Sequence, residues 1–322
     1  MRRSTVGTAL LLAAALPAVV VLGTGAASTA APAPIGTSVA SAVVATPSTA
    51  SVLRASGPVP LSWEGGHAVA VAPRWWPRGK AYPSAAWPAL WPKPVAFSPT
   101  KKGPLSGLVI ALDPGHDIGN RNHVSLINKT YWVGLTKTCN TTGTATNAGY
   151  PEATYNFDVV ARLRRLLVAN GATVVVTRDR NTASTYGPCV GARGAFPSQE
   201  KAKFMVQVHA DGGPASGRGF HVIAPAYYKG YTDDIYLGSG RLAAAMVAGM
   251  VSQGLPRSTY LSKTIQVRKD TGAINMSDVP TVTVETLNMR NAADARLAMS
   301  TAGRQKVAAA LFAGILRYAR TL

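Results

Sequence analysis

Acidic residues are scarce in this chain of 322 residues. It has 14 Asp and Glu against 33 Lys and Arg, which gives a formal net charge of +19 at pH 7. Such a charge favours anionic partners but does not say which. The sequence lacks paired Cys and His zinc-finger ligands, an aromatic RNA-binding strand and a basic recognition helix, so we expect no nucleic-acid partner. An anionic cell wall or a membrane surface fits the charge equally well.

Long apolar runs are also absent, with one exception at the N-terminus. Arg2 and Arg3 precede an apolar segment at 9–22, and small residues continue to residue 31. This order is typical of a signal peptide, which we place at 1–31. The apolar segment is shorter than the roughly 20 residues that a membrane-spanning helix needs, although an uncleaved signal would serve as an anchor. We expect a secreted protein that acts outside the cytoplasm.

Cysteine is nearly absent, because Cys139 and Cys189 are the two in the chain. An even number of cysteines in an exported chain favours a disulfide over free thiols. On the chain-entropy model, a bridge that closes a loop of about fifty residues stabilises the fold by roughly 4 kcal/mol. We therefore predict a disulfide between these residues, with two free thiols as the alternative.

The segment 32–103 is rich in Ala, Pro, Ser and Thr and then in Trp and Pro. Dense proline prevents regular helix and removes donors from a strand, so we predict an extended tether. Five of the six tryptophans lie in it, where they could stack on wall glycans, contact a membrane interface or pack against the folded domain. Packing or a plain linker is the favoured interpretation, and we expect the catalytic domain at 104–322.

From residue 104 onward, short apolar runs alternate with amphipathic segments. The runs predict strands, and apolar residues at helical spacing predict helices. We expect strands at 108–112, 174–176, 204–208, 220–223 and 282–284, and helices at 152–170, 235–253 and 301–322. This alternation is typical of a single α/β domain with a largely parallel central sheet covered by helices on both faces. In such sheets, ligands bind beyond the carboxyl ends of the strands.

Four ionisable residues fall at the ends of predicted elements. His116 and His209 each follow a strand, Glu152 opens a helix, and Glu285 ends a strand. Two imidazoles and one carboxylate form a common catalytic zinc set, with a fourth position open for water or substrate. The chain has four glutamates, and two of them take these positions. Singly, each residue is explained as a turn histidine, a helix N-terminal acid or a loop acid; together they predict a site for one Zn²⁺ per chain.

Four sequence motifs carry a family resemblance. They are LDPGH at 112–116, GTATNAGYPE at 143–152, HADGG at 209–213 and VETLNMRN at 284–291. In this order they resemble the zinc-dependent N-acetylmuramoyl-L-alanine amidases, over roughly residues 108–322. The resemblance implies zinc ligation by His116, Glu152 and His209. It implies an acid/base role for Glu285.

The resemblance also implies a reaction and its partners. The family cuts the amide between the lactyl group of N-acetylmuramic acid and the L-alanine of the stem peptide, so we expect peptidoglycan or muropeptides as substrates. We also expect location in the cell wall, contact with its anionic polymers, and a monomer. Cys139 and Cys189 lie as in secreted members that carry a disulfide. Arg218 could bind a substrate carboxylate through its guanidinium, whereas His221 is interpreted as a core or surface histidine.

Two other functions remain open on the sequence. The first is another zinc hydrolase of the wall, such as a peptidase that cuts within the stem with the same ligand set. The second is a noncatalytic wall-binding or activator protein, which would not need Glu285. The products of peptidoglycan digestion distinguish these classes, because an amidase leaves a free lactyl carboxylate.

Overall fold

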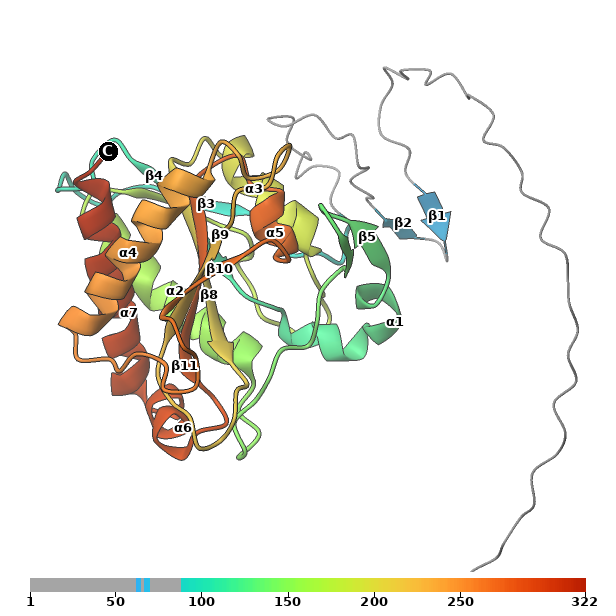
Figure 1. Cartoon of the computed structure of the whole chain (residues 1–322). Helices are drawn as coiled ribbons and strands as arrows, with labels where there is room; N and C mark the ends of the chain where they lie inside the picture. Colours follow the sequence, from blue (N-terminus) through green and yellow to red (C-terminus); the bar gives the residue numbers. More distant parts are fainter. Residues whose placement is uncertain (1–61, 65–66, 70–87) are drawn as a thin grey trace, which may run out of the picture. The chain divides into compact units, whose positions relative to one another are not determined.

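The computed structural model describes residues 62–64, 67–69 and 88–322. A seven-stranded sheet in the order β10-β9-β11-β8-β4-β7-β3 organises the large part of them (Figure 1). Its strands are β3 (Val95–Phe97), β4 (Val109–Pro114), β7 (Thr173–Val176), β8 (Phe204–Asp211), β9 (His221–Pro225), β10 (Ile265–Arg268) and β11 (Thr281–Asn288). The predicted signal peptide lies outside the described residues.

Parallel pairing dominates the middle of the sheet. Strands β11, β8, β4 and β7 run parallel to one another. Strand β9 is antiparallel to β11, β10 follows β9 in parallel, and β3 is antiparallel to β7. The predicted α/β domain with a largely parallel sheet is confirmed, and the antiparallel strands lie toward its two edges.

Helices cover both faces of the sheet. Figure 1 shows α4 and α7 on one side and α3 and α5 on the other. The helices are α1 (Val124–Ile127), α2 (Glu152–Val168), α3 (Val190–Gln199), α4 (Tyr236–Ser252), α5 (Gly272–Asn275), α6 (Ala292–Met299) and α7 (Thr301–Ala319), with a 3₁₀ helix η2 (Ile118–Asn122). Among the described residues, none of these helices combines the length and apolar character needed to span a bilayer.

The main core explains why α2 forms where the sequence predicts it. Its apolar side chains Tyr155, Val159, Leu163 and Leu167 recur every four residues and are fully buried. They pack with strand residues of β4, β7 and β8 and with α4 and α7 in one continuous cluster. Burial of a large apolar side chain stabilises a fold by about 1.5–3 kcal/mol. This packing fixes the N-terminus of α2, and with it Glu152, relative to the sheet.

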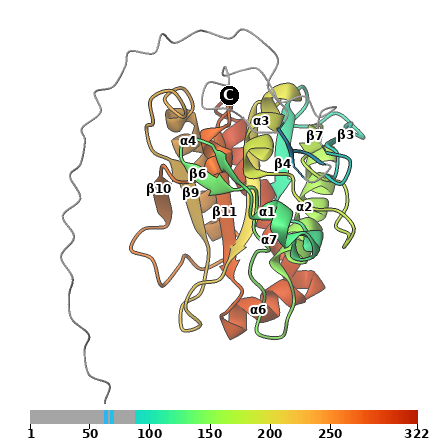
Figure 2. The ribbon, with the colours of Figure 1, turned by 90° about the vertical axis from the view of Figure 1, so that its right-hand side faces the viewer.

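A small hairpin and a disulfide lie over the face of the sheet that α3 and α5 cover. Figure 2 turns this face toward the viewer. The hairpin pairs β5 (Thr130–Trp132) with β6 (Thr136–Thr138). Directly after β6, Cys139 forms a disulfide with Cys189 at the start of α3, as predicted. At the turn of the hairpin, the Tyr228 hydroxyl donates to the Gly134 carbonyl at 2.7 Å. The hairpin is therefore held at both ends.

The folded part of the chain begins before residue 104. Strand β3 pairs with β7 as an edge strand. Trp91 is only 3% exposed and meets the Tyr186 ring edge to face at 6.4 Å between centroids. The end of the Trp/Pro-rich segment, before the predicted boundary at residue 104, therefore packs on the domain. The remainder of the predicted tether contributes the hairpin of β1 (Ser62–Glu64) and β2 (His67–Val69) or lies outside the described residues.

We predict that a protein truncated to start at residue 101 is folded less stably than one that starts at residue 88. The shorter protein loses β3 and the Trp91 side chain, and loss of one buried Trp side chain costs about 3–5 kcal/mol. For a domain of this size, we expect a melting temperature lower by about 10 °C. Calorimetry of the two proteins checks this. Equal melting temperatures would show that the segment before residue 101 adds nothing to the fold.

Candidate active site

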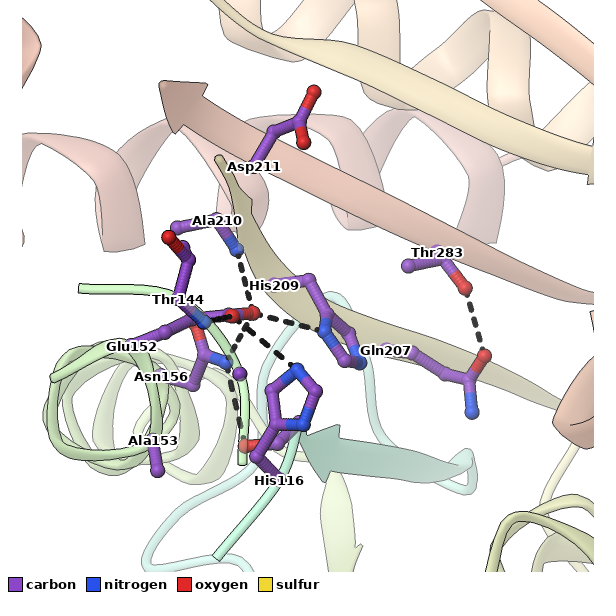
Figure 3. A network of polar contacts seen from close by, with 12 residues as sticks. His116, Thr144, Glu152, Ala153, Asn156, Gln207, His209, Ala210, Asp211 and Thr283 are labelled. Atoms are coloured by element: carbon purple, nitrogen blue, oxygen red, sulfur yellow. Dashed lines mark hydrogen bonds and ion pairs between the residues drawn. The ribbon is translucent and has the colours of Figure 1, made fainter. Parts of the chain in front are cut away.

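Three of the predicted site residues form a compact cluster. Each of His116, Glu152 and His209 offers a donor atom, and these atoms lie within 4.8 Å of one another. His116 Nε2 is 3.2 Å from one Glu152 carboxylate oxygen, and His209 Nδ1 is 3.0 Å from the other. Figure 3 shows the carboxylate beside the two imidazoles, with an interaction to each of them. The structure thus brings together two nitrogen donors and one carboxylate from distant parts of the sequence.

The pairing of β4 with β8 places both histidines at one edge of the sheet. The backbone N–H of Gly115, just beyond β4, donates to the Val208 carbonyl at 3.0 Å. A Cβ on Gly115 would lie 2.2 Å from the His209 ring, so no side chain fits there. His116 itself has a φ of 58°, a left-handed conformation that is uncommon for residues other than glycine. Glu285 and His209 also pair across β11 and β8.

Glu152 is buried at the N-terminus of α2, and every oxygen of its carboxylate is occupied. The backbone N–H groups of Thr144 and Ala210 donate to it at 2.9 and 3.2 Å, and the Asn156 amide donates at 3.2 Å. Burial alone would raise its pKa, but the charge of His116 and the hydrogen bonds from both imidazoles hold the pKa well below its usual range. The group is therefore a carboxylate at neutral pH and is fixed in orientation.

Backbone contacts determine the tautomer of His116. Its Nδ1 lies 3.0 Å from the Thr141 carbonyl oxygen, which can only accept a hydrogen bond, so Nδ1 carries the proton. That leaves Nε2 directed at Glu152. Burial opposes a charged imidazole here, but the Glu152 carboxylate outweighs it and raises the pKa of His116. An Nδ1–H donated to a carbonyl is the usual arrangement of a histidine that ligates a metal through Nε2.

Two buried arginines hold the turn that carries His116. Arg193 donates to the carbonyl oxygens of Pro114 at 2.9 Å and of His116 at 2.8 Å. Arg178 donates to the carbonyl oxygens of Pro114 at 3.0 Å and of Gly115 at 3.3 Å. Both side chains are almost fully buried, with exposed fractions of 2% and 1%. These bonds fix the backbone of the turn, and the left-handed conformation of His116 with it.

Asp113 supplies the charge that allows Arg193 to be buried. The two side chains form an ion pair, and the Gln207 amide donates to the second Asp113 oxygen at 3.1 Å. Burial would raise the Asp113 pKa, but Arg193 and the Thr177 hydroxyl hold it below its usual range. On the neighbouring strand β11, the Thr283 hydroxyl donates to Gln207 at 2.8 Å. From Asp113 to Thr283, the face of the sheet below the cluster is therefore polar and fully hydrogen-bonded.

We predict that Arg193→Met both destabilises the protein and weakens metal binding. The substitution leaves Asp113 buried without its partner, which typically costs about 3–5 kcal/mol, and it frees the His116 backbone. We expect a melting temperature lower by roughly 10 °C and a raised zinc dissociation constant. Arg180→Met, at an exposed ion pair, is the matched control and should change neither value. If the Arg193 variant melts and binds zinc as the parent does, the arginine does not hold the turn.

Glu285 differs from Glu152 in lacking partners. It lies within β11 rather than at its end, between His209 on β8 and His221 on β9 in the register of the sheet. Its Oε2 atom is buried and has no hydrogen-bond partner in the described part of the chain. Burial, followed by the charges of Glu152 and Asp211, raises the pKa of Glu285 well above its usual range. An acid with a raised pKa and a free oxygen is suited to proton transfer.

A cavity of about 430 Å³ joins Glu285 to the cluster. His116 and His209 line it beside Glu285, and Gln207, Thr283 and Ile223 of the sheet face it. Its other lining residues come from β6 and the loop after it, from α3, and from β10 and the start of α5: Lys137, Thr138, Asn140, Thr141, Val190, Arg193, Arg268, Asp270, Thr271, Gly272 and Ala273, with Asp113. The donor cluster and a candidate base thus share one space that can admit a ligand.

Arg218 and His221 lie in different surroundings from the four residues above. Arg218 is not among the residues that line the cavity; its guanidinium lies 3.5 Å from the buried carboxylate of Asp294. A role for Arg218 in substrate binding therefore has no support from its position. His221 is buried, as the core interpretation requires, and burial lowers its pKa. It also pairs with Glu285 across β9 and β11, a proximity that the sequence did not indicate.

Sequence reasoning missed the two arginines that hold the turn. Arg178 lies just beyond β7, at the same edge of the sheet as the histidines, and its position at a strand end was a usable signal. Arg193 lies within α3, in a segment of small and apolar residues. Its contacts with the turn at His116 span 77 residues in sequence, so local pattern could not reveal them.

Comparisons with known proteins agree with this geometry. Residues 110–317 match the family model described as N-acetylmuramoyl-L-alanine amidase. An N-acetylmuramoyl-L-alanine amidase of Mycobacterium tuberculosis is 36% identical over 219 residues, which cover 67% of this chain and 88% of that protein. The crystal structure of the amidase Ami1 from Mycobacterium smegmatis superposes with a TM-score of 0.63 at 34% identity, covering 68% of this chain and 99% of that one.

The apo form of Ami1 from Mycobacterium abscessus is similar in the same way, with a TM-score of 0.62 at 34% identity, and covers 66% of this chain and 99% of that one. Both structures are similar to this chain in fold as well as in sequence. The predicted family rested on four short motifs, and the family model matches the chain over residues 110–317. The chain belongs to the N-acetylmuramoyl-L-alanine amidase family, whose members act on peptidoglycan.

Proposed function

We propose that this amidase hydrolyses the bond between the lactyl group of N-acetylmuramic acid and the L-alanine of the stem peptide with a zinc ion held by His116, Glu152 and His209. One observation carries the proposal. Three donors converge within 4.8 Å beside a cavity that is also lined by Glu285, a half-buried acid whose Oε2 atom has no hydrogen-bond partner in the described part of the chain.

The donor set fits zinc better than other common ions. Two imidazoles and one carboxylate are the usual ligands of catalytic zinc, which keeps its fourth position open. Magnesium and calcium prefer sites built of oxygen ligands. The glycines around the cluster leave the space that such a site needs, since a Cβ on Gly143 would lie 2.7 Å from a Glu152 oxygen and 2.8 Å from the His116 ring.

When bound, zinc polarises a carbonyl and lowers the pKa of a coordinated water toward about 7. The chain supplies the remaining chemistry. Glu285 lies on the strand next to His209 and lines the same cavity, so it is placed to take a proton from the attacking water. It then gives that proton to the nitrogen of L-alanine as the amide bond breaks. Glu152, held by two backbone N–H groups, keeps its orientation throughout.

The same proposal covers location and partners. A signal peptide at 1–31 would export the protein to the cell wall, where its excess of Lys and Arg over Asp and Glu attracts polymers rich in carboxylate and phosphate. Such attraction between exposed charges is screened by salt. Binding to intact wall should therefore weaken as ionic strength rises, while cleavage of small muropeptides should change little. We propose that the protein acts as a monomer.

Digestion of purified peptidoglycan tests the function. The full chain, with and without a chelator, is incubated with the substrate, and the products are read by mass spectrometry. We expect intact stem peptides and glycan with free lactyl carboxylates, and no products after chelation until zinc is restored. Cleavage within the stem would identify a peptidase instead. Binding without cleavage by the zinc-loaded protein would identify a noncatalytic wall protein.

A further inference from the structure

The cavity extends well beyond the cluster. Arg268 and Asp270 line it from β10 and the loop that follows. In the sheet, β10 is three strands away from β8, which carries His209. At a spacing of about 4.8 Å between strands, this corresponds to roughly 14 Å. An extended peptide advances about 3.4 Å per residue, so a stem of about four residues can reach from the cluster to this far end.

Charge is unevenly distributed at the far end of the cavity. Arg268 and Asp270 neutralise each other through two hydrogen bonds of 2.8 and 2.7 Å. Lys137, on β6, lines the cavity and is half-buried. Within the described part of the chain, Lys137 forms neither an ion pair nor a hydrogen bond. Its charge acts on Asp270 only from a longer distance. The far end therefore has one ammonium group without a counterion in contact.

The hairpin backbone that carries Lys137 is held by its surroundings. It lies two residues before Cys139, whose disulfide anchors the base of the hairpin. At the other strand, the Trp132 indole donates to the Tyr231 hydroxyl at 2.8 Å. A lysine on a strand held at both ends loses less freedom on binding than one on a mobile loop, which favours affinity.

From these observations we infer that Lys137 is a specificity-determining residue that binds a carboxylate of the stem peptide, at a position beyond the alanine that is cut. The inference rests on the proposed function for the identity of the peptide. A carboxylate is the matching group because the uncompensated charge is positive and because Asp270 disfavours a second anion at Arg268. A hydrogen bond to a charged partner contributes about 1.5–3 kcal/mol, or roughly a 10- to 100-fold difference in affinity.

A matched pair of substrates tests this assignment. Muropeptides with a tetrapeptide stem are prepared with all stem carboxylates free or all amidated. We expect the parent protein to cleave the free acid with a kcat/KM about tenfold higher, mainly through KM. Lys137→Met should lower kcat/KM for the free acid alone, and Lys137→Arg should restore it. Lys306→Met, which removes an exposed charge from α7 on the opposite face of the sheet, should leave the preference intact.

Binding of the stem tetrapeptide, which contains no muramoyl bond, separates this inference from the proposed reaction. Calorimetry should show that Lys137→Met weakens binding of the free acid about tenfold and leaves binding of the amidated peptide unchanged. If Lys137→Met retains the parent's preference for the free acid, Lys137 is not the specificity residue. If neither muropeptide is cleaved but the peptide binds with this dependence on Lys137, the proposed reaction fails and the subsite remains.

Discussion

Glu285→Gln should fold, bind about one zinc per chain and cleave muropeptides on the order of 10²-fold or more slowly than the parent, the range typical of lost acid/base catalysis. The substitution keeps the shape of the side chain and removes its basicity. It also removes an ionisable group from a position where one carboxylate oxygen is buried without a hydrogen-bond partner, so we expect no loss of stability. The effect should fall on kcat, because the amide still occupies the space of the acid.

The measurement pairs zinc content with steady-state rates on a small muropeptide. Glu200→Gln is a suitable control, since Glu200 caps the C-terminus of α3 and does not line the cavity. It should retain the parent's rate. Two results would contradict the role proposed for Glu285: a Gln variant that stays nearly as active as the parent, or one that loses its zinc.

The different surroundings of Glu152 and Glu285 account for the different roles proposed for them. Glu152 receives hydrogen bonds on both oxygens, and against the effect of burial the charge of His116 and the hydrogen bonds from both imidazoles keep its pKa well below the usual range. Glu285 has a free oxygen, and burial together with the charges of Glu152 and Asp211 keeps its pKa well above the usual range. A group that must hold a cation benefits from the first setting, and one that must gain and lose a proton benefits from the second.

Much of this arrangement could be predicted because its determinants are local. The apolar run before His116 identified the end of β4. His209, predicted to follow a strand, lies within β8, which continues to Asp211. The parallel pairing of the two strands still brings both histidines to one edge of the sheet. The scarcity of glutamate made Glu152 and Glu285 informative. The motif at 284–291 supported the role of Glu285 even though β11 continues past it to Asn288.

Other features depend on contacts between distant segments and could not be predicted locally. Strand β3 is three residues long and follows a Pro-rich stretch, so its pairing with β7 has no periodic signal of its own. Lys137 lies on a short polar strand that is defined by its partners. The structural role of Arg193 depends on its contacts with Asp113 and His116, which are 80 and 77 residues away in the sequence.

Glu152→Ala should lose zinc and activity together, because two imidazoles alone hold the ion poorly. We expect zinc affinity to fall by more than the roughly 10- to 100-fold that removal of an outer hydrogen-bond partner of a ligand causes. The cause is twofold: a ligand is missing, and the anion that orients both histidines is missing with it.

Zinc content after dialysis, zinc titration and rates at saturating zinc distinguish this loss from that of Glu285→Gln. Added zinc should restore part of the activity of Glu152→Ala, since the proton carrier is still in place, but none of the activity of Glu285→Gln. Asp158→Asn, on the same helix in ion pairs with Arg162 and Arg304, controls for the loss of a charge from α2 and should keep its zinc. A Glu152→Ala protein that retains one tightly bound zinc per chain would require a different ligand set, and Glu285, which lines the same cavity as both histidines, would then be the first candidate for the third ligand.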